Sequence, residues 1–318
     1  MTVTIIAAVD PRRYLLLQSI TEVEMQRRHF LAGSGALAAS LAGITPNKTH
    51  AIDPFDRPSP GNLKLSLAAY SMRKYLTANE DGKQEMDLFD FVDFCADQGL
   101  PGAELTSYYF PEDVNRKYLL ELKRHCHLRG ISISGGAIRN DFCQQDEEKL
   151  EADIQHTRKW IDYYSVLGAP AIRIFAGKKK ADEPLDAALN RCAKVCSQVC
   201  RYAVRKGVML ALENHGGVTA YAKDLLSIVT QVKSPAFGIN FDSGNFRSTE
   251  DPYQELEMIA PYAVNAQVKV EITIGGKKQT SDLPRVVEIL KNSGYSGWVA
   301  LEYEAKEEPK EAIPEWLT

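Results

Sequence analysis

Short apolar runs alternate with amphipathic segments along most of this chain, and that alternation restricts the fold more than any other feature. Each run is rich in Val, Ile, Leu and Phe and is bounded by Gly, Pro or Ser, which is typical of a strand buried on both faces. The runs lie at 63–71, 101–105, 131–137, 171–175, 208–213, 236–242, 264–270 and 297–302. Eight such strands predict a mostly parallel sheet covered by helices.

The segments between the runs have the spacing of helices with one apolar face. In the first of them, Leu88, Phe91, Val92 and Cys95 fall on one side. Helices are expected at 87–98, 114–129, 146–167, 185–205, 223–232, 252–260 and 283–292. Strand–helix steps of roughly 30 residues indicate a single (β/α)8 TIM barrel, which needs about 250 residues. A doubly wound sheet is the alternative, but no Gly-x-Gly-x-x-Gly turn follows any run.

Composition and charge narrow the class of protein. The 318 residues are 44% hydrophobic and 25% charged, which is ordinary for a globular chain with a large core. A net charge of −4 gives no basic footprint for nucleic acid, so no nucleic-acid partner is expected. Lys178, Lys179 and Lys180 are interpreted as a solvated loop. After residue 60 no apolar stretch approaches the roughly 20 residues of a membrane span.

The N-terminal 60 residues have the pattern of an export segment followed by a linker. Arg27 and Arg28 precede Phe30-Leu31 and then a weakly apolar stretch of small residues. This closely resembles a bacterial twin-arginine signal over residues 25–51, and Met25 just before it is a candidate start of translation. The resemblance implies an exported, periplasmic protein. We therefore expect a signal and linker at 1–60 and the barrel at 61–318.

The six cysteines do not form the pattern of a disulfide framework. Cys192, Cys196 and Cys200 repeat every four residues, which places them along one face of a helix. A thiolate metal site is one interpretation of that spacing. The simpler interpretation, which we adopt, is that all six are reduced and mostly structural, because free Cys commonly packs as a small core residue.

Acidic or amide residues lie at the C-terminal ends of four successive strands. They are Glu213, Asp242, Gln267 and Glu302. A carboxylate in such a buried place is costly unless it is paired or binds a metal. In a barrel, active groups lie at the C-terminal ends of the strands, where these four residues fall. Three carboxylates and one amide oxygen suit a hard divalent cation, so the pattern predicts a metal-dependent enzyme.

Four short motifs around these residues carry a family resemblance. They are Leu-Glu-Asn-His-Gly-Gly at 212–217, Asn-Phe-Asp-Ser-Gly-Asn at 240–245, Gln-Val-Lys at 267–269 and Leu-Glu-Tyr-Glu at 301–304. Over about residues 63–305 the chain resembles the xylose-isomerase-like barrel superfamily of sugar isomerases and epimerases. The resemblance implies that Glu213, Asp242, Gln267 and Glu302 are the metal ligands.

Two positions depart from the family pattern. Gln267 stands where the family usually has a histidine ligand, and Asn245 stands where it often has a second histidine. A Gln carbonyl oxygen is a hard ligand, so the change favours Mn²⁺ or Mg²⁺ over Zn²⁺ as the cofactor. The change at Asn245 weakens the expectation that this residue contacts substrate.

The resemblance also implies a reaction. In the epimerases of this superfamily a metal ion polarises the sugar carbonyl and stabilises an enediolate, and two metal-bound glutamates move the proton. Those glutamates correspond here to Glu213 and Glu302. Lys269 lies two residues beyond Gln267 and therefore points into the same space, where it holds a substrate oxygen or stabilises the enediolate. Pairing of Lys269 with Glu302 or Glu304 is the alternative.

The remaining candidates are substrate-binding residues near the strand ends: His215, Glu104, Asn245, Arg173 and Tyr70. Arg173 has a second interpretation, as an interior partner of Glu104 or Glu213. The Tyr70 ring is expected to pack on a sugar, with packing at the barrel rim as the alternative. His215 either faces the substrate or donates to a ligand carboxylate.

The predicted function is a divalent-metal-dependent isomerase or epimerase that acts on a ketose, an aldose or a related polyol. A non-catalytic carbohydrate-binding barrel is the first alternative, because Gln267 and Asn245 depart from the family. An endonuclease IV-like phosphodiesterase is the second. Its zinc site needs several histidines, and only His215 follows a strand here. The expected partner is a small sugar, and the relatives suggest a possible homo-oligomer.

Overall fold

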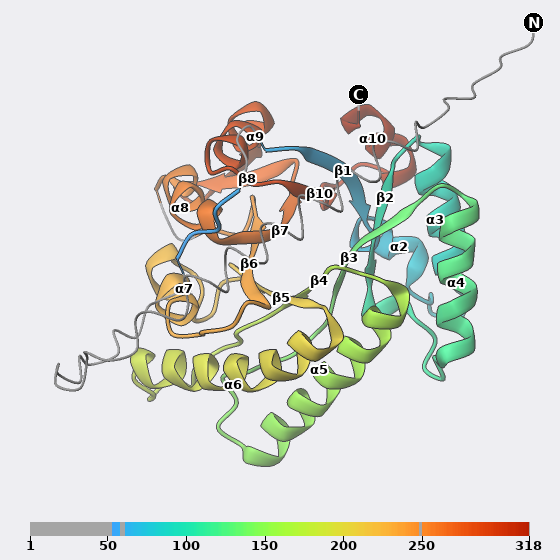
Figure 1. The fold of residues 1–318 in the computed structure, drawn as a ribbon. Helices are drawn as coiled ribbons and strands as arrows, with labels where there is room; N and C mark the ends of the chain where they lie inside the picture. Colours follow the sequence, from blue (N-terminus) through green and yellow to red (C-terminus); the bar gives the residue numbers. More distant parts are fainter. Residues whose placement is uncertain (1–52, 58–60, 248–249, 318) are drawn as a thin grey trace, which may run out of the picture. The chain divides into compact units, whose positions relative to one another are not determined.

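The computed structural model describes residues 53–57, 61–247 and 250–317 (Figure 1). They all fall within one unit, His50–Thr318. The twin-arginine-like signal at 25–51 and most of the linker lie outside the described residues. Export therefore stays a prediction.

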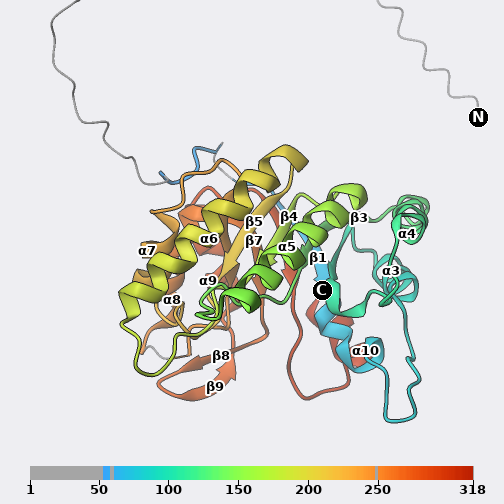
Figure 2. The ribbon, with the colours of Figure 1, turned by 90° about the horizontal axis from the view of Figure 1, so that it is seen from below.

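Eight parallel strands close into a barrel in the order β1-β10-β7-β6-β5-β4-β3-β2 (Figures 1 and 2). Their bounds are β1 Leu63–Ala68, β2 Gly102–Thr106, β3 Ser132–Ala137, β4 Ala171–Ile174, β5 Met209–Glu213, β6 Phe237–Asp242, β7 Ala263–Val268 and β10 Gly297–Leu301. Closure comes from the first and last of these strands, which pair from Leu63↔Gly297 to Leu67↔Leu301. The predicted single (β/α)8 barrel is confirmed.

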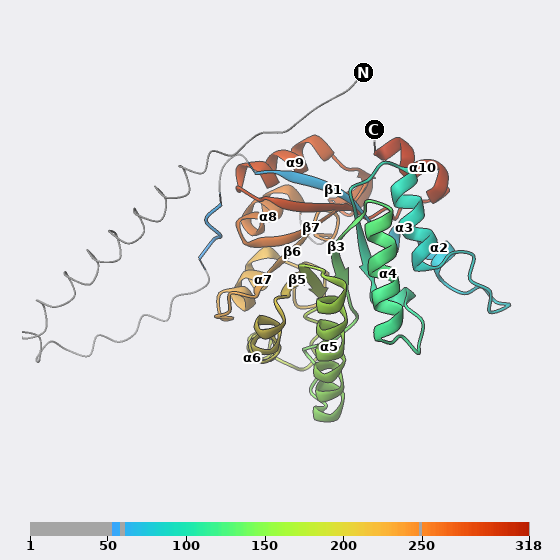
Figure 3. The same cartoon turned by 45° about the vertical axis from the view of Figure 1, so that its right-hand side comes forward.

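A ring of helices surrounds the barrel (Figure 3). The ring consists of α3 Leu88–Asp97, α4 Arg116–Leu128, α5 Glu147–Leu167, α6 Leu185–Lys206, α7 Ala222–Val229, α8 Pro252–Ile259 and α9 Leu283–Asn292. Each buries one apolar face, as the sequence predicted; α3 buries Leu88, Phe91, Val92 and Cys95. Gly168 and Gly207 end α5 and α6 with φ of 86° and 69°, a left-handed conformation that glycine adopts without strain.

Several short elements were not predicted from the sequence. The first strand ends at Ala68 rather than residue 71, and the 3-10 helix η1 Ala69–Met72 and helix α2 Arg73–Leu76 follow it. An antiparallel hairpin, β8 Glu271–Ile274 and β9 Lys277–Thr280, follows β7 and projects from the lower edge of the barrel in Figure 2. The chain ends in α10 Pro309–Trp316, and 3-10 turns lie at η2 Ser107–Tyr109 and η3 Ala260–Tyr262.

The cysteines lie in the core, as predicted. All six are free and buried. Within α6 the Sγ atoms of Cys192 and Cys196 lie 3.9 Å apart. Burial raises the pKa of Cys200, at the end of that series, to about 12, so it remains a thiol. These features support a structural role. Within the described part of the chain, no helix has both the length and the apolar character needed to cross a membrane.

Candidate active site

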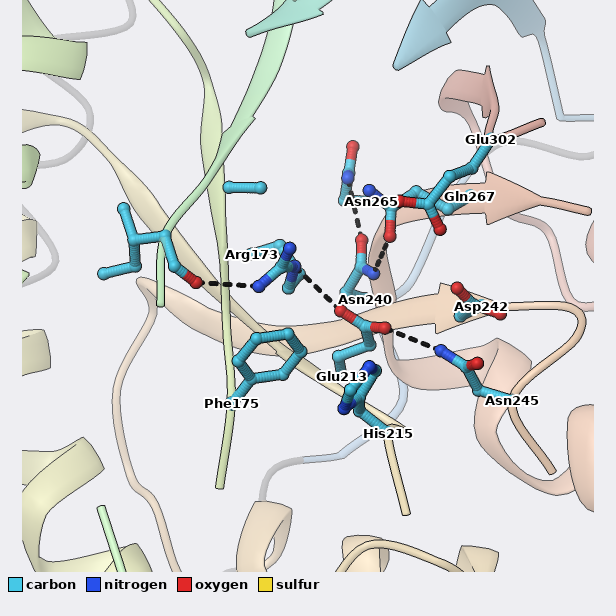
Figure 4. A network of polar contacts seen from close by, with 12 residues as sticks. Arg173, Phe175, Glu213, His215, Asn240, Asp242, Asn245, Asn265, Gln267 and Glu302 are labelled. Carbon is cyan, nitrogen blue, oxygen red and sulfur yellow. Dashed lines mark hydrogen bonds and ion pairs between the residues drawn. The ribbon is translucent and has the colours of Figure 1, made fainter. Parts of the chain in front are cut away.

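The predicted carboxylates come together inside the barrel, where its strands end (Figure 4). Glu213 ends β5, Asp242 ends β6 and Glu302 directly follows β10. None is more than 5% exposed. The backbone N–H of Glu302 donates to the carbonyl of Val268 at 2.8 Å, which fixes this residue against the end of β7. Parallel strands thus deliver acidic side chains from distant parts of the sequence to one place.

Asn214 locks two of these strand ends together. Its side-chain Nδ2 donates to the carbonyl of Asp242 at 2.9 Å, and its Oδ1 accepts from the N–H of Asp242 at 3.0 Å. Asp242 is held further because its Oδ1 accepts from the N–H of Gly244 at 2.8 Å. The acidic cluster is therefore rigid on the β5–β6 side.

A buried layer of amides lies beneath the carboxylates. Glu104 Oε1 accepts from Asn265 Nδ2 at 2.8 Å, and its Oε2 accepts from Gln267 Nε2 at 2.5 Å. The carbonyl oxygen of Gln267 accepts from Asn240 Nδ2 at 2.7 Å. Since an ionised carboxylate only accepts hydrogen bonds, Glu104 orients the Gln267 amide and turns its oxygen toward Asn240. Gln267 was expected to bind a metal, but its oxygen accepts the hydrogen bond from Asn240 inside this layer.

Glu104, expected to contact substrate, belongs to the same layer. It is fully buried. Burial raises the pKa of Glu104 to about 7, although the hydrogen bonds from Asn265 and Gln267 act in the opposite direction. It contacts amides of the layer and does not line the cavity described below. Its role in this structure is to organise the barrel interior.

Arg173 is the interior partner of Glu213, one of its two predicted interpretations. The Nε of Arg173 lies 2.8 Å from Glu213 Oε2, and its Nη1 donates to the carbonyl of Ile138 at 2.7 Å. Its guanidinium stacks 3.9 Å from the centre of the Phe175 ring. On the other side of Glu213, Oε1 accepts from Asn245 Nδ2 at 2.8 Å. Burial nevertheless raises the pKa of Glu213 to about 7, against the pull of Arg173.

The Lys269 ammonium lies among the other acidic groups. Its Nζ is 3.2 Å from Asp242 Oδ2, 3.2 Å from Glu302 Oε2 and 2.9 Å from Glu304 Oε2. The predicted pairing of Lys269 with Glu302 or Glu304 is thus confirmed for both. The three carboxylates outweigh burial and raise the pKa of Lys269 well above its usual value. The side chain is charged in this site.

The carboxylates around Lys269 differ in protonation. Burial raises the pKa of Glu302 to about 7 and that of Asp242 to about 6, with Lys269 opposing both shifts. In half-buried Glu304, Lys269 outweighs burial and lowers the pKa. The site therefore holds a group that is firmly ionised, Glu304, beside groups that exchange protons near neutral pH.

His215 lies beside the Phe175 ring, with their centres 4.3 Å apart. Burial lowers the pKa of His215, and the nearby cations Arg173 and Lys269 lower it further. The imidazole is therefore neutral at pH 7. This places it at the edge of the site as a neutral hydrogen-bonding group.

A cavity of about 170 Å³ opens between these groups. It is lined by Tyr70, Tyr108, Arg139, Arg173, Phe175, Glu213, His215, Lys269, Glu302 and Glu304. A wider cavity of about 610 Å³ adjoins it and shares Tyr70, Tyr108 and Arg139. Half-buried Tyr70 thus stands at the cavity wall, as its expected contact with a sugar requires. Asn245 does not line this cavity and acts through Glu213 and Lys269.

Sequence reasoning missed several residues of the site. Arg139, Phe175 and Glu304 line the cavity, and Asn240 and Asn265 build the amide layer. The first three each lie within three residues of a strand end, which is the signal available in the sequence. Asn240 and Asn265 each lie two residues before an identified residue, Asp242 and Gln267, and so share its inward face.

The model of the Xylose isomerase-like TIM barrel family matches residues 92–318. The chain belongs to this family. No curated protein matches the sequence.

Solved structures of other proteins share the fold. A xylose isomerase domain protein from Planctomyces limnophilus is 17% identical with a TM-score of 0.61, covering 81% of this chain and 95% of that one. The 3-keto-D-glucoside 4-epimerase of E. coli is 14% identical with a TM-score of 0.64, covering 80% and 99%. A D-psicose 3-epimerase from Clostridium cellulolyticum is 15% identical with a TM-score of 0.63, covering 79% and 89%.

The donor set of this xylose isomerase-like barrel does not fit the predicted divalent ion in the arrangement described. Asp242 and Glu302 face the Lys269 ammonium, Glu213 faces Arg173, and the Gln267 oxygen faces Asn240. Among the residues that the structure describes, no three or more His, Cys, Asp or Glu side chains form a metal site. Asp242 Oδ2 faces the Lys269 ammonium, and Glu213 Oε2 faces the Arg173 guanidinium. Neither oxygen has an aligned hydrogen bond.

Proposed function

We propose that the protein is a sugar isomerase or epimerase that moves a proton at the carbon next to a sugar carbonyl. The observation that carries this proposal is a pair of buried glutamates facing one small cavity with Lys269. Burial raises the pKa of both Glu213 and Glu302 to about 7. Near neutral pH each is populated in both protonation states, so one accepts a proton while the other donates one.

The named relatives support the class of substrate. The structures of similar fold include a 3-keto-D-glucoside 4-epimerase, an L-ribulose 3-epimerase and a D-psicose 3-epimerase. Each of these names describes an inversion at one carbon of a sugar. A small ketose or aldose is the substrate class we propose here by analogy with them.

The residues have distinct proposed roles. One glutamate, as carboxylate, removes the proton next to the carbonyl, and the negative charge moves onto the carbonyl oxygen. The Lys269 ammonium donates to that oxygen and stabilises the enediolate. The other glutamate, as acid, returns a proton. Return to the opposite face of the same carbon gives an epimer. Return to the neighbouring carbon, with the hydroxyl proton passing to the former carbonyl oxygen, gives an isomer.

Other groups hold the sugar. The rings of Tyr70 and Tyr108 offer apolar faces on which a sugar packs. Neutral His215, which lines the cavity, is available to hydroxyl groups of the sugar. Arg173 keeps Glu213 in place through its ion pair and its hydrogen bond to Ile138.

The test is interconversion of a panel of ketoses and aldoses, followed by chromatography of the products. Glu213→Gln and Glu302→Gln should each lower kcat by about 10²–10⁴-fold, the contribution typical of a general acid or base. Glu183→Gln is the matched control, because Glu183 is also a buried carboxylate, paired with Arg191 at 2.5 Å, but lies outside the site. If Glu213→Gln and Glu302→Gln both kept the native activity that Glu183→Gln is expected to keep, the proposed roles would be refuted.

A carbohydrate-binding barrel without turnover is the second candidate. Lys269 and Arg173 neutralise much of the acidic cluster, as they would in a site built only for binding. Saturable sugar binding without interconversion of any sugar in the panel would favour it. The endonuclease IV-like alternative has little support, because His215 is the single histidine that lines the described cavity.

Export and assembly remain proposals based on the sequence. We propose a periplasmic protein from the Arg27-Arg28 pattern, and cell fractionation with an Arg27→Lys/Arg28→Lys variant tests this. A homo-oligomer is proposed by analogy with relatives and is tested by light scattering.

A further inference from the structure

The Lys269 ammonium is surrounded by oxygen atoms in the way that a bound cation is. Besides Asp242, Glu302 and Glu304 at 2.9–3.2 Å, the Oδ1 of Asn245 lies 3.1 Å from Nζ. These four oxygens come from the ends of β6 and β10 and the segments that follow them. Asp242 and Glu302 are two of the residues predicted to bind the metal.

The protein is shaped to hold the lysine in this position. A Cβ atom at Gly244 would lie 2.8 Å from Cδ of Lys269 and 2.9 Å from the carbonyl of Glu271, so only glycine leaves room for the lysine stem. The backbone N–H of Lys269 donates to Ser243 Oγ at 2.8 Å. The side chain is 7% exposed. Ser243 and Gly244, which directly follow Asp242, thus form a cradle for Lys269.

We infer that the Lys269 ammonium takes the place of the divalent ion in this barrel, so that the site works without a metal. A metal ion among the same oxygens would lie next to the ammonium, and like charges at such a distance repel. Moving the ammonium away would leave buried carboxylates without a counter-charge, which is strongly unfavourable. The Gln267 oxygen, the fourth predicted ligand, is already bound by Asn240.

An ammonium in the place of the metal ion has a consequence for the reaction, and this step rests on the proposed function. An ammonium has three N–H donors, whereas four oxygens lie within reach of Lys269 Nζ. The donors are therefore shared, and a sugar carbonyl oxygen that enters the cavity competes for one of them. Lys269 then stabilises the negative oxygen directly through a charge-assisted hydrogen bond.

The test is a calorimetric titration of Mn²⁺ into the chelator-treated full chain, without substrate, so its result does not depend on the proposed reaction. The native protein should give no saturable binding at the site. Lys269→Ala and Lys269→Met remove the ammonium, and Lys269→Met retains much of the lysine stem. Either variant, if folded, should gain one-to-one Mn²⁺ binding that a second change, Asp242→Asn, removes. Lys278→Ala, which removes an exposed lysine paired with Glu271, is the control and should behave as native.

Two results would overturn the inference. One is tight one-to-one Mn²⁺ binding by the native protein that Asp242→Asn removes, because the ion and the ammonium would then not exclude each other. The other is a folded Lys269→Met variant that binds no Mn²⁺. The carboxylates would then be unable to bind a divalent ion even without the ammonium. The native titration needs no variant, so it decides the first point even if the substitutions prevent folding.

Discussion

The acidic residues of this site differ in pKa because each has a different neighbour. Lys269 lowers the pKa of Glu304, whereas burial outweighs the cations at Glu213 and Glu302 and raises their pKa to about 7. One ionised carboxylate thus accompanies the ammonium permanently. The two glutamates that line the cavity keep the capacity to exchange protons, which is the property that proton transfer requires.

This difference predicts a bell-shaped dependence of kcat/KM on pH, with its maximum near pH 7. On the acid side activity falls because the glutamate that removes the proton becomes protonated. On the alkaline side it falls because the glutamate that returns the proton becomes ionised. A pH series on the sugar that the panel identifies measures this. A profile that is flat from about pH 5 to about pH 9 would exclude glutamates with such pKa values as the acid and base.

The raised pKa of Glu104 makes the free energy of unfolding depend on pH. Its pKa in the folded protein, about 7, lies above the 4.5 of a free side chain, so the folded state binds the extra proton between these values. The free energy of unfolding therefore falls as pH rises from about 4.5 through 7. Glu104→Gln lacks this titration. Relative to native, the variant should gain up to about 3 kcal/mol on going from acid to alkaline pH, at about 1.4 kcal/mol per pKa unit.

Urea unfolding of the native protein and the Glu104→Gln variant at about pH 5 and about pH 8 measures this difference. The other buried carboxylates titrate in both proteins, so the comparison isolates Glu104. A stability difference that does not change with pH would show that Glu104 titrates as it does in the unfolded chain.

At the scale of the element, strand β3 shows how barrel and helices fit. Gly136 faces Tyr164 of α5, and a Cβ atom there would lie 2.2 Å from the ring. That ring is fixed, because its hydroxyl donates to the carbonyl of Leu105 at 2.5 Å. Gly135, the neighbouring residue, has its nearest contact at 3.4 Å, an ordinary packing distance.

We predict that Gly136→Ala lowers the free energy of unfolding by about 1–3 kcal/mol or more, since overpacking forces the ring or the strand to move. Gly135→Ala is the matched control and should cost clearly less. Urea unfolding of both variants gives the comparison. Equal losses in the two would mean that Tyr164 adapts, and that the helix is not held against β3 by this contact.

The elements that the sequence did not predict have little periodicity to reveal them. The hairpin β8–β9 has mostly exposed or half-buried residues, so no buried face marks it out in the sequence. Its turn, Gly275-Gly276 with φ of 55° and 74°, was the available signal, because two-residue hairpin turns favour such glycines. Residues 69–71 extended the first predicted strand because they continue its apolar composition, whereas the chain turns there into η1.

At the scale of the whole molecule, the barrel was predictable because each strand and helix has a clear period and parallel strands need helical crossovers. The placement of Glu213, Asp242 and Glu302 was predictable for the same reason, since strand ends meet at one face. The surroundings of Gln267 were not. They depend on the register that sets Asp242 opposite Gln267 and Asn240 opposite Asn265, which the sequence of one strand does not contain.

The predicted metal site shows what the ends of single strands do not reveal about their neighbours. Three carboxylates and an amide suggested a divalent ion, but two of these carboxylates, Asp242 and Glu302, suit an ammonium when the lysine that follows β7 reaches them. Lys269 was recognised as a candidate, but its position at the centre of the cluster follows from the close approach, at Gly244, of the segments that follow β6 and β7. The Mn²⁺ titration decides between these two interpretations of the cluster.

Hydrogen exchange at carbon in deuterated water tests the proposed reaction and the metal-free site together. The chelator-treated native protein would be incubated with ketoses and aldoses, and deuterium at the carbon next to the carbonyl would be followed by NMR. We expect deuterium incorporation into at least one sugar, together with its epimer or isomer, and formation of that product about 10²–10⁴-fold more slowly in Glu302→Gln. Exchange that appears only after Mn²⁺ is added would contradict the metal-free site, and the absence of exchange with every sugar, with or without Mn²⁺, would contradict the proposed reaction.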